Sequence, residues 1–223
     1  MGRNQGINKI GEVGYTGLPF KTMPQIYVPY FNPIGHLYES PDGSPMDSVT
    51  TIIKAECGQV FFGDGAAAER GTAVHKTCQY FDEKDLDESK VPVNVCPYLE
   101  QYKLALAAHK IVVLENEMMR FHPLYLYAGQ LDKIALVDGV KGIIDIKTGK
   151  EYFDHKWQLA AYKDMIKHEH TEDLKRWNLY LSPDSFRLVE RTGAKDFQEF
   201  LALYTAHNIL VKYGFRKQKG ENI

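Results

Sequence analysis

Hydrophobic and polar positions along the first two thirds of the chain predict helices followed by consecutive strands. The apolar run between Ser48 and Gly58 predicts a short helix with a serine cap and a glycine end. Apolar residues return at helical spacing in residues 64–83 and again from Pro97 to His109. The residues that follow alternate as strands do, with a turn signal at Asp138-Gly139. These strands are expected to be antiparallel, over residues 111–121, 124–137 and 141–148.

The last third of the chain predicts a helix, a strand pair and another helix, over residues 153–170, 176–182, 185–192 and 196–214. This order predicts an α/β or α+β fold, in which helices pack on a small mixed sheet. Short extended segments with a turn at Ser40–Gly43 are expected before the first helix. We therefore divide the chain into an N-terminal extension (1–47), one domain (48–213) and a basic tail (214–223).

Composition and charge leave the class of partner open. The chain has 223 residues, 44% hydrophobic and 25% charged, as is ordinary for a globular protein, and its formal net charge is −2. A protein that only covers nucleic acid would be basic, so the overall charge does not point to a polyanion as binding partner. A local basic groove on an acidic protein is still compatible with nucleic-acid binding.

The three cysteines and the hydropathy pattern bear on location. Cys57, Cys78 and Cys96 are odd in number and form no CxxC pair, which favours free thiols in a reducing compartment. No signal peptide and no run of about 20 apolar residues is found, so no membrane span is expected. These observations favour a cytoplasmic protein.

Charged residues interrupt two strands that should be buried. In IIDIKT, Asp145 and Lys147 share one face by alternation, and the Asp138-Gly139 turn can bring Asp132 of the neighbouring strand beside Asp145. Two close carboxylates repel unless a cation lies between them, and Mg²⁺ prefers oxygen ligands. A divalent cation activates water, and a nearby ammonium group offsets phosphate charge, as phosphodiester hydrolysis requires. Taken alone, the DIK stretch is more typical of a surface Asp–Lys cross-pair in a sheet.

Four motifs in order change that balance. The chain carries Gly71-Thr-x-x-His75, Gly129-x-x-Asp132, Asp145-x-Lys147-Thr148 and Gln158-x-x-x-Tyr162. Together they resemble the PD-(D/E)XK nuclease superfamily, in its RecB-like exonuclease branch. The stretches AAERGTAVH and YAGQLDKI are most similar to phage and prophage recombination exonucleases. The resemblance implies a restriction-endonuclease-like core.

The resemblance also implies roles for single residues. Asp132 and Asp145 would be catalytic metal ligands, together with His75 and the backbone carbonyl of Ile146, and Lys147 would be the catalytic lysine. The expected strand glutamate is Glu117, with Glu115 as an open alternative. Gln158 would brace the lysine or contact DNA. Apart from the resemblance, Arg70 is expected to contact a DNA phosphate or, equally, to form a surface ion pair. Thr148 is expected to bind phosphate or simply to end the strand, and Tyr162 to contact DNA or support the site.

Two departures from the family pattern limit what is carried over. Leu131 stands where the superfamily name has a proline, which the RecB-like branch tolerates. Relatives with an iron–sulfur cluster use four cysteines, most of them beyond the Gln-x-x-x-Tyr helix, and this chain has none after Cys96. We therefore expect Mg²⁺, with Mn²⁺ as a substitute, and no iron–sulfur cluster.

The expected function is a magnesium-dependent DNA exonuclease that resects linear duplex ends 5′-to-3′ for single-strand annealing. The metal site and the hydrolysis follow from the residues. The exonuclease preference, the polarity, an annealing protein as partner and a ring-shaped homo-oligomer are expected from the resemblance alone. Alternatives are a single-strand-specific exonuclease, a structure-specific endonuclease, and an inactive nuclease-like DNA-binding module.

Overall fold

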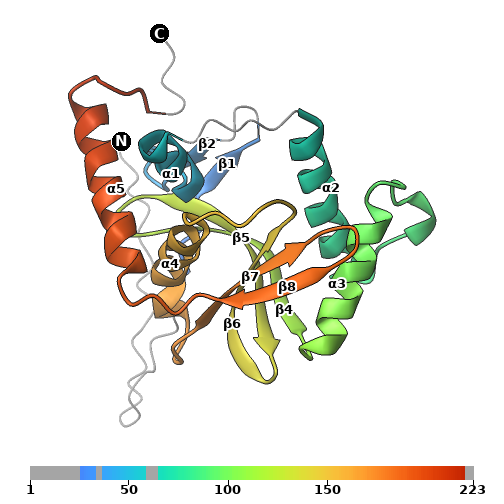
Figure 1. Cartoon of the computed structure of the whole chain (residues 1–223). Helices are drawn as coiled ribbons and strands as arrows, with labels where there is room; N and C mark the ends of the chain where they lie inside the picture. The colour runs from blue at the N-terminus through green and yellow to red at the C-terminus, as the bar shows by residue number, and fades with distance from the viewer. Residues whose placement is uncertain (1–25, 34–36, 59–64, 219–223) are drawn as a thin grey trace, which may run out of the picture.

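The computed structural model describes residues 26–33, 37–58 and 65–218 (Figure 1). Its strands are β1 (Tyr30–Asn32), β2 (Leu37–Glu39), β3 (Pro45–Met46), β4 (Val112–Phe121), β5 (Ala128–Val137), β6 (Val140–Lys147), β7 (Lys175–Leu181) and β8 (Phe186–Glu190). Its α-helices are α1 (Val49–Cys57), α2 (Gly65–Asp82), α3 (Cys96–Ala108), α4 (His155–Ile166) and α5 (Asp196–Lys212). Short 3-10 helices cover Glu88–Lys90 and Lys167–Glu169.

A five-stranded mixed sheet in the order β4-β5-β6-β7-β8 forms the centre of the molecule. The pairs β4–β5, β5–β6 and β7–β8 are antiparallel, whereas β6 and β7 are parallel. A parallel pair needs a crossover connection, and α4 supplies it between β6 and β7. The predicted α/β fold with a mixed sheet is confirmed.

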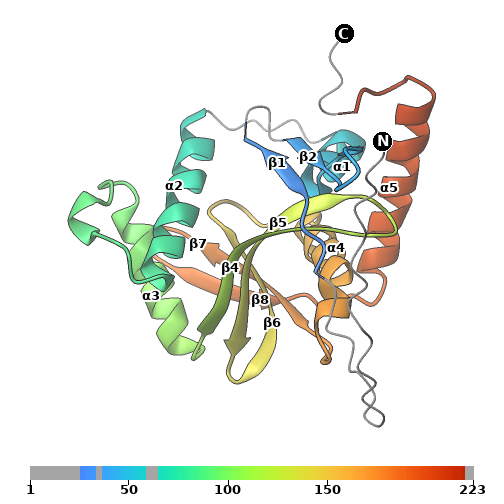
Figure 2. The same ribbon diagram turned by 180° about the vertical axis from the view of Figure 1, so that it is seen from behind.

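Helices cover both faces of this sheet (Figures 1 and 2). On one face, Ile143 of β6 packs into a core with residues of α1, α4 and α5, among them Ile52, Leu159 and Phe200. On the other face, Ile144 and Ile146 pack against α2 and α3. Strand β6 is therefore buried on both sides, which explains its almost continuous apolar sequence.

Local signals define two of the element boundaries. The hydroxyl of Ser48 accepts a hydrogen bond from the Thr51 amide at 3.1 Å, and Gly58 ends α1 in the left-handed conformation. Asp138 and Gly139 have φ values of 48° and 83°, as a type I′ hairpin turn requires. The predicted short helix and the predicted hairpin are both confirmed.

The start of β5 differs from the prediction. Alternation predicted a strand from Leu124, but β5 begins at Ala128. Two backbone amides, those of Leu124 and Tyr125, donate to Nδ1 of His122 at 3.1 Å each, and this folds the segment into a turn. A side-chain acceptor thus replaces the strand pairing that the pattern predicted. Helix α4 is also shorter than expected and ends at Ile166.

The N-terminal segment packs on the domain through its own small antiparallel sheet, in the order β1-β2-β3. Tyr38 and Met46 of this sheet share a buried cluster with Phe121 and Ala128 of the main sheet. The Ala128 amide donates to the carbonyl of Asp47 at 3.1 Å. The short extended segments predicted before α1 are therefore present and lie beside the start of β5 (Figure 2).

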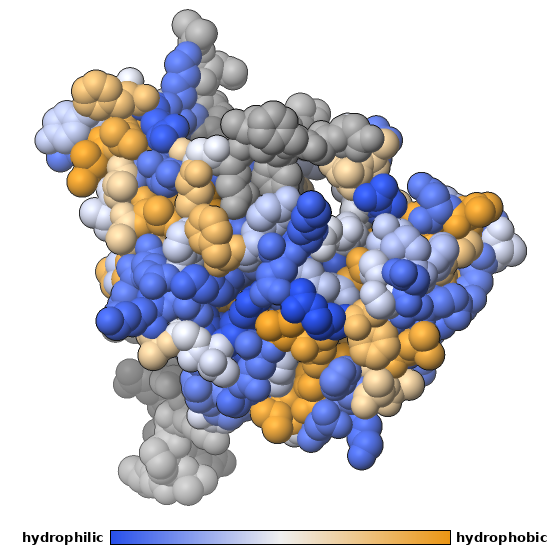
Figure 3. Space-filling model, viewed as in Figure 1, coloured by the Kyte–Doolittle hydropathy of each residue, from blue (hydrophilic) through white to orange (hydrophobic). Residues whose placement is uncertain are grey.

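Within the described part of the chain, no helix combines the length and the apolar character needed to cross a membrane. Hydrophilic side chains cover most of the face seen in Figure 1, with apolar side chains between them (Figure 3).

Candidate metal-dependent active site

The two aspartates lie where the pairing of two central strands ends. Backbone pairing of β5 with β6 runs from Val137 and Val140 to Lys133 and Ile144. At the next position, Oδ2 of Asp132 accepts a hydrogen bond from the Ile146 amide at 2.7 Å. The Asp132 side chain thus takes the place of a backbone acceptor, and this holds its carboxylate beside β6.

Asp145, Lys147 and Gln158 form one hydrogen-bonded group. The ammonium group of Lys147 lies 2.9 Å from Oδ2 of Asp145 and donates to Oε1 of Gln158 at 2.8 Å. Nε2 of Gln158 donates to the hydroxyl of Tyr162 at 3.1 Å, one helical turn further along α4. Two sequence motifs, one on β6 and one on α4, therefore meet at the lysine.

A second group contains His75, Glu117 and Asp132. A ligand atom of each lies within 4.8 Å of the other two, a spacing at which one metal ion could bind all three. Nδ1 of His75, on α2, lies 3.4 Å from Oδ2 of Asp132. The three side chains come from a helix and two adjacent strands, so only the folded chain assembles them.

The structure distinguishes the two strand glutamates. Glu115 is half exposed, and its carboxylate lies 4.0 Å from Arg120. Glu117 adopts a left-handed backbone conformation, with φ of 50°, and a register shift lies between Val113 and Glu115. By simple alternation, both glutamates would lie on one face of the strand. These irregularities break that alternation. Only Glu117 joins the cluster with His75 and Asp132.

Two motif glycines allow the elements to approach each other. A β-carbon at Gly129 would lie 2.5 Å from Cε1 of Tyr162, so glycine is the residue that fits above this ring. A β-carbon at Gly71 would lie 3.3 Å from Oγ1 of Thr148, where α2 passes the end of β6. The glycines thus bring together the elements that carry the polar residues.

Burial and mutual repulsion perturb the acids of the site. Burial raises the pKa of Glu117 to about 7, and the Asp132 charge contributes to the rise. Burial also raises the pKa of Asp145, against the opposing effect of Lys147. For Asp132, burial is outweighed by His75, Lys147 and the Ile146 amide, so its pKa lies below the ordinary value. Acids that disfavour each other's charge are expected where a cation normally binds.

The donor set fits a divalent cation. One imidazole and two carboxylates offer nitrogen and oxygen ligands at a common point, as Mn²⁺ and Mg²⁺ sites can use. Asp145 is not part of this cluster. Its carboxylate accepts hydrogen bonds from Lys147 and from Asn178. Its role as a ligand, like that of the Ile146 carbonyl, stays a prediction.

The residues expected to contact DNA flank the cluster. Arg70 lies on α2 with its guanidinium 5.9 Å from the ring centre of Tyr98, and its Nε is buried with no hydrogen-bond partner among the described residues. Thr148 ends β6 beside Gly71. Tyr162 is buried, and its hydroxyl accepts a hydrogen bond from Gln158. It therefore packs behind Gln158 and does not face solvent.

Sequence reasoning missed two polar residues on the neighbouring strands. Asn178 of β7 is fully buried and donates from Nδ2 to Oδ2 of Asp145 at 2.8 Å. Arg191, just after β8, donates from Nε to Oδ1 of Asn178 at 2.7 Å. An asparagine inside the apolar stretch RWNLYL was the signal that could have identified the first residue.

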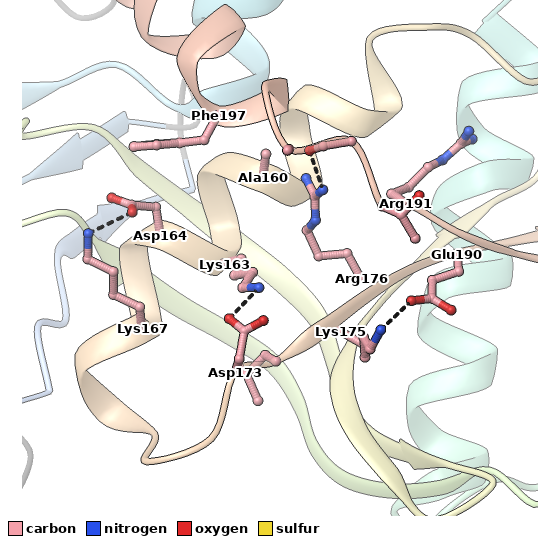
Figure 4. Close-up of a pocket in the computed structure, with 14 residues that line it drawn as sticks. Ala160, Lys163, Asp164, Lys167, Asp173, Lys175, Arg176, Glu190, Arg191 and Phe197 are labelled. Carbon is pink, nitrogen blue, oxygen red and sulfur yellow. Dashed lines mark hydrogen bonds and ion pairs between the residues drawn. The ribbon is translucent and has the colours of Figure 1, made fainter.

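A cavity of about 440 Å³ lies between α4, β7 and the start of α5, away from the cluster (Figure 4). Its lysines are neutralised by carboxylates at 2.6–2.8 Å, in the pairs Lys163–Asp173, Lys167–Asp164 and Lys175–Glu190. The two arginines that also line the cavity have carboxylate partners as well, Arg176 with Asp196 and Arg191 with Glu151. A cavity whose cations are all paired offers no free cation to bind an anion. The described chemistry therefore lies at the strand ends and not in this cavity.

Comparison with known proteins supports the fold. No family model matches the chain, and no curated protein matches its sequence. Among solved structures, it is similar to a candidate exonuclease from Eubacterium rectale, with a TM-score of 0.50 and 14% identity over 82% of this chain and 80% of that one. The structure of SSO0001 matches with a TM-score of 0.34 and 19% identity, over 73% of this chain and 84% of that one. The likeness to the candidate exonuclease shows a shared fold.

Proposed function

We propose that this protein is a divalent-metal-dependent DNA exonuclease. The observation that carries the proposal is the cluster of His75, Glu117 and Asp132, next to Asp145 and Lys147 on the adjoining strand. The fold likeness to a candidate exonuclease and the four motifs of a RecB-like nuclease support the same activity. Mg²⁺ is the proposed cofactor, with Mn²⁺ as a substitute.

The residues of the chain divide the work of phosphodiester hydrolysis. His75, Glu117 and Asp132 would hold the cation, with Asp145 and the Ile146 carbonyl completing the set. When bound, the cation supplies positive charge that activates water and polarises the phosphate. Lys147, held by Gln158 at 2.8 Å, would orient the attacking water and offset charge that develops on the phosphate.

The substrate we propose is the end of a linear DNA duplex, degraded 5′-to-3′. Arg70 and Thr148 would bind phosphate groups beside the cluster, where α2 meets the end of β6. We further propose, from the resemblance, that the single strand so exposed is used for annealing recombination with an annealing protein. A ring-shaped oligomer would hold the enzyme on its substrate. Light scattering after gel filtration would detect it.

The test uses a linear duplex labelled separately at its 5′ and 3′ ends, with a circular duplex alongside, in Mg²⁺. Early release of the 5′ label with an intact circle is expected. Cutting of the circle would show an endonuclease, and digestion of single strands alone would show a single-strand enzyme. If none of these substrates is cut although DNA is bound, the protein is an inactive binding module.

Asp132→Asn tests the metal ligand directly. Replacing a charged oxygen ligand with an amide should abolish Mn²⁺ binding in calorimetry and Mg²⁺-dependent cleavage in the labelled-duplex assay. Asp138→Asn is a matched control, because Asp138 lies in the exposed hairpin turn. A metal titration of Asp132→Asn that equals wild type would refute the ligand assignment.

A further inference from the structure

A chain of hydrogen bonds continues behind the site, from Asp145 into β7 and beyond β8. Asn178 stands opposite Asp145 in the parallel register of β6 and β7. Its Nδ2 donates to Oδ2 of Asp145 at 2.8 Å, and its Oδ1 accepts from Nε of Arg191 at 2.7 Å. Asn178 has no exposed surface. Water therefore cannot compete for either half of its amide.

The direction of this chain follows from the chemistry of its members. An amide can turn over and exchange its donor and acceptor, but a guanidinium group only donates. Arg191 therefore requires Oδ1 of Asn178 to face it, which leaves Nδ2 facing Asp145. An ionised carboxylate only accepts, so the order from Arg191 through Asn178 to Asp145 is fully matched.

Arg191 is itself held in place. One of its terminal nitrogens lies 2.7 Å from Oε1 of Glu151, and the other donates to the hydroxyl of Tyr180 at 2.7 Å. Its side chain is 15% exposed. Figure 4 shows Arg191 at one edge of the cavity, with its guanidinium directed away from the lysine–carboxylate pairs. Arg191 thus serves the strand network and not the cavity.

We propose that Arg191 and Asn178 are positioning residues that set the orientation of the Asp145 carboxylate, an inference that rests on the proposed function. Lys147 reaches both oxygens of this carboxylate, at 3.1 Å and 2.9 Å. Without the Asn178 amide, the carboxylate is free to turn toward the ammonium group. The carboxylate would then be unable to take its proposed ligand position beside His75, Glu117 and Asp132, and the lysine would be drawn away from Gln158.

The experiment is a double-mutant cycle of Arg191→Ala, Asn178→Ala and the double variant, with two readouts. Mn²⁺ binding is measured by calorimetry without DNA, and kcat and KM are measured on labelled duplex. Residues that orient a metal ligand typically contribute about 10–100-fold to affinity or activity. We expect each variant to lose affinity and kcat in this range with little change in KM. The double variant should lose no more than Asn178→Ala.

Two further variants separate positioning from structure. Arg187→Ala is the matched control, because Arg187, on β8, also pairs with Glu151 at 2.7 Å but has no described hydrogen bond to Asn178. It should keep wild-type affinity and kcat. Arg191→Lys keeps a donor for Oδ1 and should recover part of the loss. If Asn178→Ala does not fold, the two Arg191 variants still decide the question through Mn²⁺ affinity.

Distinct results would overturn the inference. Arg191→Ala with wild-type Mn²⁺ affinity and kcat would overturn it, even if thermal stability fell. So would an Arg191→Ala effect that persists undiminished in the Asn178→Ala background. Both results leave the proposed nuclease intact, provided that wild type binds Mn²⁺ and cuts DNA. A wild-type chain that does neither overturns the proposed function and this inference together.

Discussion

Position 129 shows how a single hydrogen atom in place of a side chain supports the site. Gly129 lies over the ring of Tyr162, whose hydroxyl accepts from Gln158, which in turn holds Lys147. A methyl group here would push the ring and loosen the contact between Gln158 and the lysine. The glycine in Gly-x-x-Asp is therefore explained by packing against the tyrosine of Gln-x-x-x-Tyr.

Gly129→Ala should accordingly impair both stability and cleavage. Overpacking of a buried site costs about 1–3 kcal/mol, so the urea midpoint should fall. Cleavage of labelled duplex should fall as Tyr162 and Gln158 shift. Gly149→Ala is the control, because a β-carbon there meets nothing within 4 Å. Wild-type stability for Gly129→Ala would mean that the ring moves without cost.

Lys147 is the residue whose chemistry the proposed mechanism needs most. Lys147→Ala should abolish cleavage while duplex binding, measured by fluorescence anisotropy, stays close to wild type. The reason is that Lys147 is bound to Asp145 and Gln158, whereas the expected phosphate contacts come from Arg70 and Thr148. Lys150→Ala is a control on an exposed lysine nearby. A Lys147→Ala variant that still cuts would rule out the assigned role.

Helix α2 depends on a buried ion pair for its place against β5. The ammonium group of Lys133 lies 2.5 Å from Oδ2 of Asp82 and donates to Asn116 at 2.8 Å. The hydroxyl of Tyr102, on α3, donates to the same carboxylate. Asp82 lies two turns beyond His75 on α2, and Lys133 follows Asp132 on β5. The pair therefore holds the part of α2 that carries His75 close to the part of β5 that carries Asp132.

Lys133→Met should leave the Asp82 carboxylate buried and uncompensated. Removing one partner of a buried pair costs about 3–5 kcal/mol of unfolding free energy, measurable by urea denaturation. Lys133→Met with Asp82→Asn should recover part of this loss, since the amide can still accept from Tyr102. Lys103→Met, which removes solvent-accessible ion pairs with Glu88 and Glu100, is the control and should change little. Equal stability of Lys133→Met and wild type would exclude the anchoring role.

Helix α5 is attached to α1 through a buried histidine. His207 is 2% exposed, and its ring nitrogens lie 3.0 Å from Asp47 and 3.0 Å from Glu56 of α1. The hydrogen bond with Asp47 raises the pKa of His207, burial opposes the rise, and Glu56 adds to it. The folded state therefore binds the proton more tightly than the unfolded chain does.

This pair makes stability depend on pH in a defined direction. A raised folded pKa contributes stability that is complete below the ordinary value of 6.5 and is lost as pH rises through the folded pKa. Urea unfolding of wild type against His207→Gln, at pH 6 and at pH 9, should show a smaller difference at pH 9. A difference that is the same at both pH values would contradict a charged His207.

At the scale of the whole molecule, the small N-terminal sheet is part of the folded body. Tyr38 and Met46 cover Phe121 and Ala128, and Asp47 holds both the Ala128 amide and His207. The segment thus covers the start of β5, and β5 carries Asp132. The functional division of the chain at residue 47 stays a prediction.

A chain shortened to residues 48–223 tests how far the domain stands alone. Loss of this cover exposes Phe121 and removes one carboxylate partner of the buried His207, so the unfolding midpoint in urea should fall. His207→Gln in the shortened chain separates the two effects, since it should add little once Asp47 is gone. Full stability of the shortened chain would show that the domain does not need the segment.

Much of the fold could be predicted because its signals are local. Alternation predicts the central strands, Asp138-Gly139 predicts the hairpin, and Ser48 with Gly58 predicts α1. The same alternation, with the hairpin, predicts that Asp132 approaches β6, and the structure places it at the Ile146 amide. Side-chain periodicity and turn geometry act over a few residues, so the sequence by itself determined these features.

Tertiary structure decided what joins distant segments. Glu117 enters the cluster in place of Glu115 because a left-handed residue and a register shift interrupt alternation, and neither has a sequence signal here. Asn178 reaches Asp145 through the parallel pairing of β6 with β7, and Arg191 contacts Asn178. This pairing depends on how α4 packs across the sheet. Such contacts arise from the packing of whole elements, which local periodicity does not encode.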